Sequence, residues 1–140
     1  MTRTLALVVA VAAAGIVANA GSTKPIERSG ALHVTKKCPD YHGLAGEHCT
    51  ITSSNLAAIP IGSTVVYADA AVFPTLDSDI VVYTRGANAV YGHVQLDFTT
   101  YTGRITFSGG TGQFKKFQAT VDVTPLGGVN FAWDGTYSYR

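Results

Sequence analysis

Asp77 and Asp79 are the side chains in this sequence best suited to acid–base chemistry, because two carboxylates stand two residues apart at the start of a strand-like segment. In an extended chain, side chains at positions i and i+2 point to the same side. Like charges held that close raise the pKa of one carboxyl group, which can then keep a proton near neutral pH. The structural alternative is that Asp77 caps a turn and Asp79 begins a solvated strand. We take the pair as the candidate catalytic residues.

A second set of side chains suits a small-molecule site, because it combines aromatic walls with a few polar groups. The candidate ligand-binding residues are Tyr67, Tyr83, Arg85, His93, Asp97 and Trp133. His93 and Asp97 lie on the polar face of segment 91–99, opposite Val94 and Leu96. That polar face lines the lumen if the protein is a ligand-holding barrel, and faces water if the barrel is filled. We prefer the arrangement with the apolar face inside.

Cys38 and Cys49 are the only cysteines, and the sequence offers two uses for them. In an exported chain, an even pair is most simply one disulfide, here closing residues 39–48 into a loop. The alternative is a zinc site completed by His42 and His48. The spacing matches no common zinc finger, so we predict the disulfide and no metal site.

The N-terminus resembles a secretory signal peptide, with Arg3 as a short basic region, an apolar stretch at 5–17 and Ala-Asn-Ala at 18–20. An uncleaved anchor is the alternative, but the apolar stretch is short for a bilayer, which needs about 20 residues. The expected division of the chain is a signal peptide at 1–20, a flexible leader at 21–30 and one domain at 31–140. We therefore expect a secreted protein that has no membrane contact after cleavage.

Charge and motifs exclude several classes of function. The chain has 10 Lys and Arg against 9 Asp and Glu, and cleavage after residue 20 would remove Arg3 and make the two counts equal, which leaves no basic excess for a nucleic-acid surface. The serines lack a nucleophile elbow, and the four histidines form no metalloprotease motif. The sequence thus offers no signature of a hydrolase or of a nucleic-acid-binding protein.

Short alternating segments bounded by Gly, Pro, Asn or Ser predict an all-β domain. The expected strands are 32–37, 48–53, 64–70, 79–84, 91–99, 104–108, 115–124 and 129–139. Short connections make neighbours antiparallel, and closing eight strands into a barrel removes exposed edges. We predict a closed antiparallel eight-stranded barrel; a two-sheet sandwich is the alternative.

The glycine-rich segment 109–114, GGTGQF, lies between two expected strands. Consecutive glycines permit positive φ and close strand approach, whereas a phosphate-binding loop would need a helix after it. The segment resembles the G-G-T-G-x-F turn of allene oxide cyclases and dirigent proteins, and looser similarity to allene oxide cyclase barrel-like proteins occurs at 49–55, 76–79 and 133–137. The resemblance covers most of 38–139.

The resemblance implies a barrel of the calycin type, whose lumen shapes a reactive small molecule without a metal or organic cofactor. We accordingly expect a secreted barrel that binds a small apolar ligand, with a cofactor-free isomerase or cyclase activity as its enzymatic form. The alternative is a non-enzymatic structural or interaction module with a filled barrel. Whether the protein is an enzyme stays open. A homo-oligomer is compatible with the sequence, with Tyr101 and Tyr139 as candidate contact residues.

Overall fold

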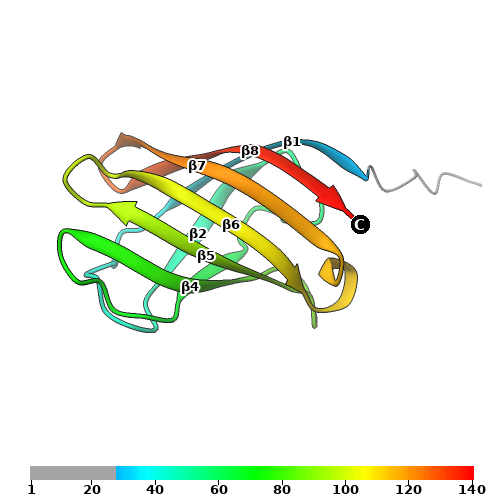
Figure 1. Ribbon diagram of the computed structural model, residues 1–140, viewed down its shortest axis with the longest axis horizontal. Coiled ribbons are helices and arrows are strands. Elements are labelled where there is room, and N and C mark those ends of the chain that lie inside the picture. The colour runs from blue at the N-terminus through cyan, green and yellow to red at the C-terminus, as the bar shows by residue number, and fades with distance from the viewer. Residues whose placement is uncertain (1–27) are drawn as a thin grey trace, which may run out of the picture.

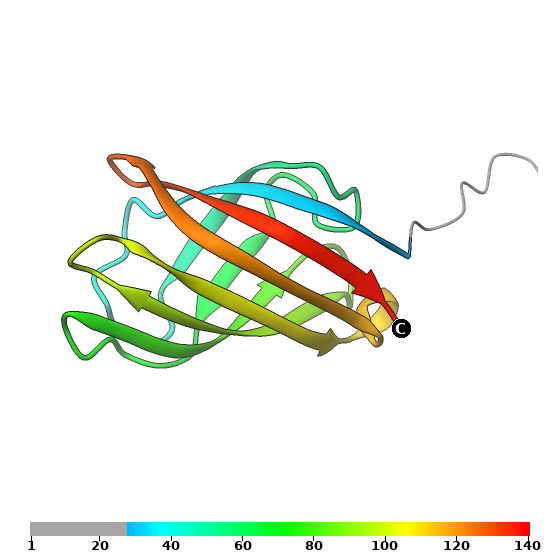
Figure 2. The same cartoon turned by 45° about the horizontal axis from the view of Figure 1, so that its top comes forward.

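The computed structural model describes residues 28–140 as a single closed barrel of eight antiparallel strands (Figures 1 and 2). The strands are β1 (Ser29–Lys37), β2 (His48–Ser54), β3 (Thr64–Tyr67), β4 (Thr75–Tyr83), β5 (Ala89–Asp97), β6 (Thr102–Gly110), β7 (Phe117–Gly127) and β8 (Asn130–Tyr139). Each strand pairs with its neighbour in sequence, and β1 closes the barrel by pairing with β8. The predicted barrel is confirmed, and the sandwich alternative is wrong. The expected signal peptide and residues 21–27 of the leader lie outside the described residues.

Alternation along each strand sorts side chains between lumen and solvent. In β5 the apolar Val90 and Val94 are buried while His93 and Gln95 are exposed, so the preferred inward face of this strand is confirmed. The aliphatic and aromatic residues of all eight strands form one continuous core. The outer face of the barrel wall is therefore exposed to solvent, and its inner face is apolar.

Strand ends differ from the prediction mainly around β3 and β4. β3 ends at Tyr67 instead of residue 70, and β4 begins at Thr75 instead of residue 79. Between them, side-chain bonds replace the regular ladder: the Asp69 amide donates to Ser78 Oγ at 3.0 Å, and the Asp79 amide donates to Asp69 Oδ2 at 3.0 Å. β1 also begins two residues before the expected start of the domain, pairing Ser29 with Ser138.

One end of the barrel is closed by packed side chains. The glycine-rich segment there connects β6 to β7 through the 3₁₀ helix η1 (Gly112–Phe114), which carries Phe114 into the core with no exposed surface. Gly110 must be glycine because a Cβ would lie 2.0 Å from the Ala89 carbonyl oxygen. Within residues 28–140, η1 is the only helical element. This part of the chain therefore contains no helix that is long and apolar enough to span a bilayer.

The opposite end, at the left in Figure 1, is formed by the four loops 38–47, 68–74, 98–101 and 128–129. The predicted disulfide between Cys38 and Cys49 is confirmed and ties the longest of these loops to β2. With the two thiols bonded to each other, the zinc-site alternative has lost its sulfur ligands. We call this side the open end and the η1 side the closed end.

Candidate ligand site at the open end of the barrel

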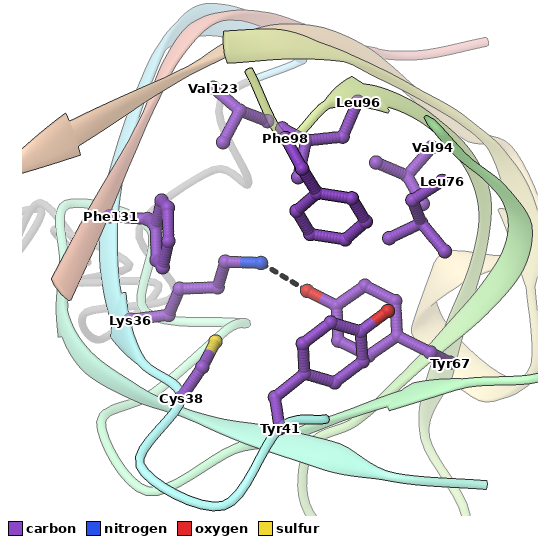
Figure 3. A pocket seen from close by; sticks show the side chains of 10 residues that line it. All are labelled: Lys36, Cys38, Tyr41, Tyr67, Leu76, Val94, Leu96, Phe98, Val123 and Phe131. Carbon is purple, nitrogen blue, oxygen red and sulfur yellow. Dashed lines mark hydrogen bonds between the residues drawn. The ribbon is translucent and has the colours of Figure 1, made fainter. Parts of the chain in front are cut away.

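Lys36 occupies a lumen position near the open end of β1. Leu32, Val34 and Lys36 alternate with exposed or half-buried neighbours, so the period of the strand turns the lysine inward with the two aliphatic residues. The side chain is only 5% exposed. Figure 3 shows its amino group reaching across the lumen toward the hydroxyl of Tyr67 on β3. A buried lysine in an apolar barrel requires an explanation, because lysines are almost never fully buried unless paired.

The partners of the Lys36 ammonium group are aromatic. Its Nζ donates a hydrogen bond to Tyr67 Oη. Nζ also lies 4.9 Å from the ring centroid of Tyr67, 5.0 Å from that of Trp133 and 5.6 Å from that of Phe131. Such distances allow cation–π attraction, which strengthens where water is excluded. The rings stabilise a charge at this position without neutralising it.

Burial lowers the pKa of Lys36 to about 7 from its ordinary 10.5, because the charged amine has lost its water. Among residues 28–140, no carboxylate forms an ion pair with Lys36 that would offset this loss. The amine is therefore poised between its charged and neutral forms near neutral pH. Strongly shifted groups of this kind concentrate at functional sites.

A cavity lies beside Lys36 and widens toward the open end. Its inner part has a volume of about 30 Å³, and the outer part, partly open to solvent, has about 500 Å³. The two parts share four lining residues, Cys38, Tyr41, Phe98 and Phe131, so they lie next to each other with these side chains between them. The remaining lining of the inner part is Lys36, Tyr67, Leu76, Val94, Leu96 and Val123. The wall is thus apolar and aromatic, with a few polar tips.

Tyr41 lies at the neck between the inner and outer parts. Its ring centroid is 5.0 Å from that of Tyr67 and 6.3 Å from that of Phe98. Its hydroxyl is buried and has no hydrogen-bond partner within the described residues, which is also true of Trp133 Nε1. Burial and the charge of Glu47 raise the pKa of Tyr41 to about 12, and burial raises that of Tyr67. Both tyrosines therefore stay protonated and can donate hydrogen bonds.

Backbone and side-chain bonds hold the loop that carries Tyr41. Glu47 accepts hydrogen bonds from the amides of His42 and Leu44 at 2.9 and 2.7 Å. These bonds, with that from the His42 ring, lower the pKa of Glu47. The Cys38 amide donates to the Val129 carbonyl at 2.9 Å, and the Ala71 amide to that of Gly43 at 2.8 Å. The disulfide loop is thereby fixed against two neighbouring loops of the open end.

The candidate ligand-binding residues divide between the two faces of the wall. Tyr67 and Trp133 are buried in the lumen and contact Lys36. The other four, Tyr83, Arg85, His93 and Asp97, are exposed and do not line the cavity. On β4 and β5 the inward positions belong to apolar residues such as Leu76 and Val94, so the intervening polar positions must face water.

Asp77 and Asp79 share one side of β4, as expected, but that side is the outer wall. Both are exposed, and both bond the ring of His93 on the next strand: Asp79 Oδ1 lies 2.8 Å from Nδ1, and Asp77 Oδ1 bonds Nε2. The bonds to Asp79 and Asp77 raise the pKa of His93. The arrangement is a cross-strand ion pair in solvent, which stabilises pairing of β4 with β5 weakly. It lies outside the lumen.

Sequence reasoning missed Lys36, Tyr41, Phe98 and Phe131 as site residues. For Lys36 a signal was present, because the alternation of Leu32 and Val34 continues to it. For Tyr41 none was present, since its position depends on how the disulfide loop folds over the lumen. No protein-family model matches the chain, and a comparison with curated proteins finds no match.

Proposed function

We propose that this protein binds a small, largely apolar molecule in the lumen at its open end. The observation that carries the proposal is the pair of adjoining cavities at the open end, about 30 Å³ inside and about 500 Å³ outside, walled mainly by aromatic and aliphatic side chains. Ligand pockets are typically apolar concavities with a small number of convergent polar groups. Lys36, Tyr41 and Tyr67 supply those groups here.

The filled-barrel alternative describes the closed end only, where Phe107, Phe114 and Phe117 pack together. The enzymatic form, a cofactor-free isomerase or cyclase, receives less support than binding, because Asp77 and Asp79 lie on the outer wall. Export belongs to the same proposal, since a disulfide is compatible with an extracellular location. The proposal also includes kinship with allene oxide cyclase and dirigent barrels. Its support is the position of the glycine-rich turn between two strands.

A neutral, environment-sensitive fluorophore such as N-phenyl-1-naphthylamine tests the proposal. Its fluorescence should rise on binding to the wild-type protein and fall when a small apolar molecule displaces it. Leu96→Trp places a large ring in the inner cavity and should abolish the signal. Val81→Trp adds the same ring to the outer face of β4 and is the matched control, which should bind like wild type. Absence of binding by the wild-type protein, or equal binding by both variants, contradicts the proposal.

A further inference from the structure

We propose that the inner cavity is a carboxylate-binding subsite in which Lys36, Tyr67 and Tyr41 are the donors, so that the ligand of this barrel is an apolar carboxylic acid. The inference rests on the proposed function and adds the chemical class of the ligand. The acid group would lie beside Lys36, and the apolar part would extend toward the open end between Phe98 and Phe131.

The polar lining of the inner cavity consists of donors without an anionic acceptor. Among its lining residues the polar side chains are Lys36, Tyr67 and Tyr41. The Tyr41 hydroxyl is buried without a partner within the described residues, and the lysine is buried without a carboxylate. Leaving a buried hydroxyl unpaired, or a buried ammonium group without a counter-ion, costs free energy. A ligand that supplies a negatively charged acceptor would satisfy both.

The size of the inner cavity suits an acid head group. A cavity must provide roughly 10–15 Å³ to hold one water molecule, and the inner part provides about 30 Å³. It therefore has room for about two oxygen atoms, as a carboxylate has. The remaining lining residues are aliphatic or aromatic, apart from the sulfur of Cys38. The cavity thus combines a group of polar donors with an otherwise apolar wall. A hydrophobic acid has the matching arrangement of one polar group and an apolar remainder.

A noncovalent anion fits this site better than an imine between Lys36 and a carbonyl compound. Imine formation needs a group that moves protons while water leaves. The titratable groups beside Lys36 are Tyr41 and Tyr67, whose pKa values are raised, so they are poor proton-transfer groups near neutral pH. As fixed donors, in contrast, they complement a carboxylate, and hydrogen bonds to an ionised acceptor are the stronger kind.

Binding of an acid should depend on pH because Lys36 must be charged to pair with it. The titratable groups that face Lys36 are Tyr67 from β3 and Tyr41 from the disulfide loop; β4, β5, β7 and β8 present apolar side chains to the inner cavity. His42 lines only the outer part, and Glu47, which raises the pKa of Tyr41, lines neither. Since the free lysine has a pKa of about 7, binding above that pH requires uptake of one proton. Affinity should then fall about tenfold for each pH unit.

The test compares hexanoate, octanoate and decanoate with hexanol, octanol and decanol by calorimetry between pH 7 and pH 9. We expect the acids to bind with the tenfold decline and the alcohols to bind without pH dependence. Lys36→Met should weaken acid binding about a hundredfold at pH 7 and remove the pH dependence, while changing alcohol binding only a few-fold. Lys37→Met, one residue along and exposed, is the matched control and should retain the wild-type decline.

Tyr41→Phe is the variant that leaves the fold intact, because its hydroxyl has no partner within residues 28–140. It should weaken acid binding about tenfold and leave alcohol binding unchanged. If acids and alcohols bind the wild-type protein equally at every pH, the carboxylate subsite is overturned while the proposed function stands. If neither series binds, the proposed function fails with it.

Discussion

The two ends of the lumen are built on the same eight strands but differ in what fills them. At the closed end, Phe114 and Phe117 pack edge to face with centroids 5.4 Å apart, and both are fully buried. At the open end, Tyr41, Phe98 and Phe131 are only partly buried and surround a cavity. Trp133 lies between the ends, 5.7 Å from the Phe107 ring and 5.0 Å from Lys36 Nζ. The packed rings of the closed end stabilise the barrel. The open end is less well packed and places a polar group, Lys36, in an apolar wall, which lowers its contribution to stability.

The difference arises from the loops and not from the walls. At the closed end, η1 inserts Phe114 as a plug over the strands. At the open end, the disulfide loop folds beside the lumen and contributes Tyr41 to its rim. A barrel scaffold thus keeps its core at one end and varies its chemistry at the other, which is where loops on rigid scaffolds commonly place function.

Removing a ring from each end gives the largest contrast. Phe114→Ala should lower the free energy of unfolding by about 3–5 kcal/mol, because it leaves a cavity in a fully packed site. Phe98→Ala should lower it by about 1–2 kcal/mol, since that side chain is half-buried and already borders a cavity. Urea unfolding of both variants measures the difference. Equal losses would mean that the open end is packed as firmly as the closed end.

Lys36→Met should act in the opposite direction and stabilise the protein. The unfolded lysine titrates at 10.5 and the folded one at about 7, so the unfolded state holds the extra proton between these values. Wild-type stability should therefore rise with pH across that window, by up to roughly 3–5 kcal/mol. Allowing for the lost contact with Tyr67, we expect the variant to be more stable by about 2–3 kcal/mol at pH 7. The advantage should vanish near pH 10.5.

Unfolding curves of wild type and Lys36→Met at a series of pH values check this trend, and Lys37→Met is the control for removing a lysine from the surface. A difference that stays constant from pH 7 to pH 10.5 would contradict the buried, weakly basic amine.

Replacing both cysteines by serine should loosen the open end more than the closed end. Opening the bond between Cys38 and Cys49, which are 11 residues apart in sequence, should cost roughly 2–3 kcal/mol in the loop-entropy model. Hydrogen exchange should accelerate more at the amides of positions 38 and 71 than at the Phe114 amide of η1, which responds only to the loss of global stability. Equal acceleration at all three amides would show that the disulfide does not stabilise the open end in particular.

The smallest effects are expected on the outer wall, which belongs to neither end. Asp77→Asn and Asp79→Asn should each change stability by less than about 1 kcal/mol, because these carboxylates are exposed and screened. The raised pKa of His93 means that its charged form contributes stability below pH 6.5 and that this is lost as the pH rises through the folded pKa. Ligand binding should be unchanged in both variants. A loss of ligand binding as large as that expected for Lys36→Met would show that Asp77 and Asp79 take part in the functional site.

Alternation was sufficient to predict the barrel walls from sequence. It located eight strands and the inward face of β5, and the single pair of cysteines indicated the disulfide. It also predicted that Asp77 and Asp79 share a side. That this side is the outer one follows from Leu76 and Ile80, because their apolar side chains take the inward positions of β4.

The candidate site was less accessible to sequence reasoning. The same alternation pointed Lys36 inward, but a lysine at a strand end is ordinarily exposed. Tyr41 and Phe131 become site residues only when the disulfide loop and the start of β8 meet at the open end, where the Cys38 amide bonds the Val129 carbonyl. That contact joins segments about ninety residues apart in sequence, and local sequence patterns do not predict contacts of such long range.

The most direct test of a ligand site centred on a buried lysine is a carbon-13 NMR titration of the lysine Cε groups. We expect one lysine to titrate near pH 7, to be missing from the spectrum of Lys36→Met, and to shift to a higher pKa when octanoate is added. If instead every lysine of the folded protein titrates near 10.5 and none responds to octanoate, Lys36 is solvated and the open end is not the site described.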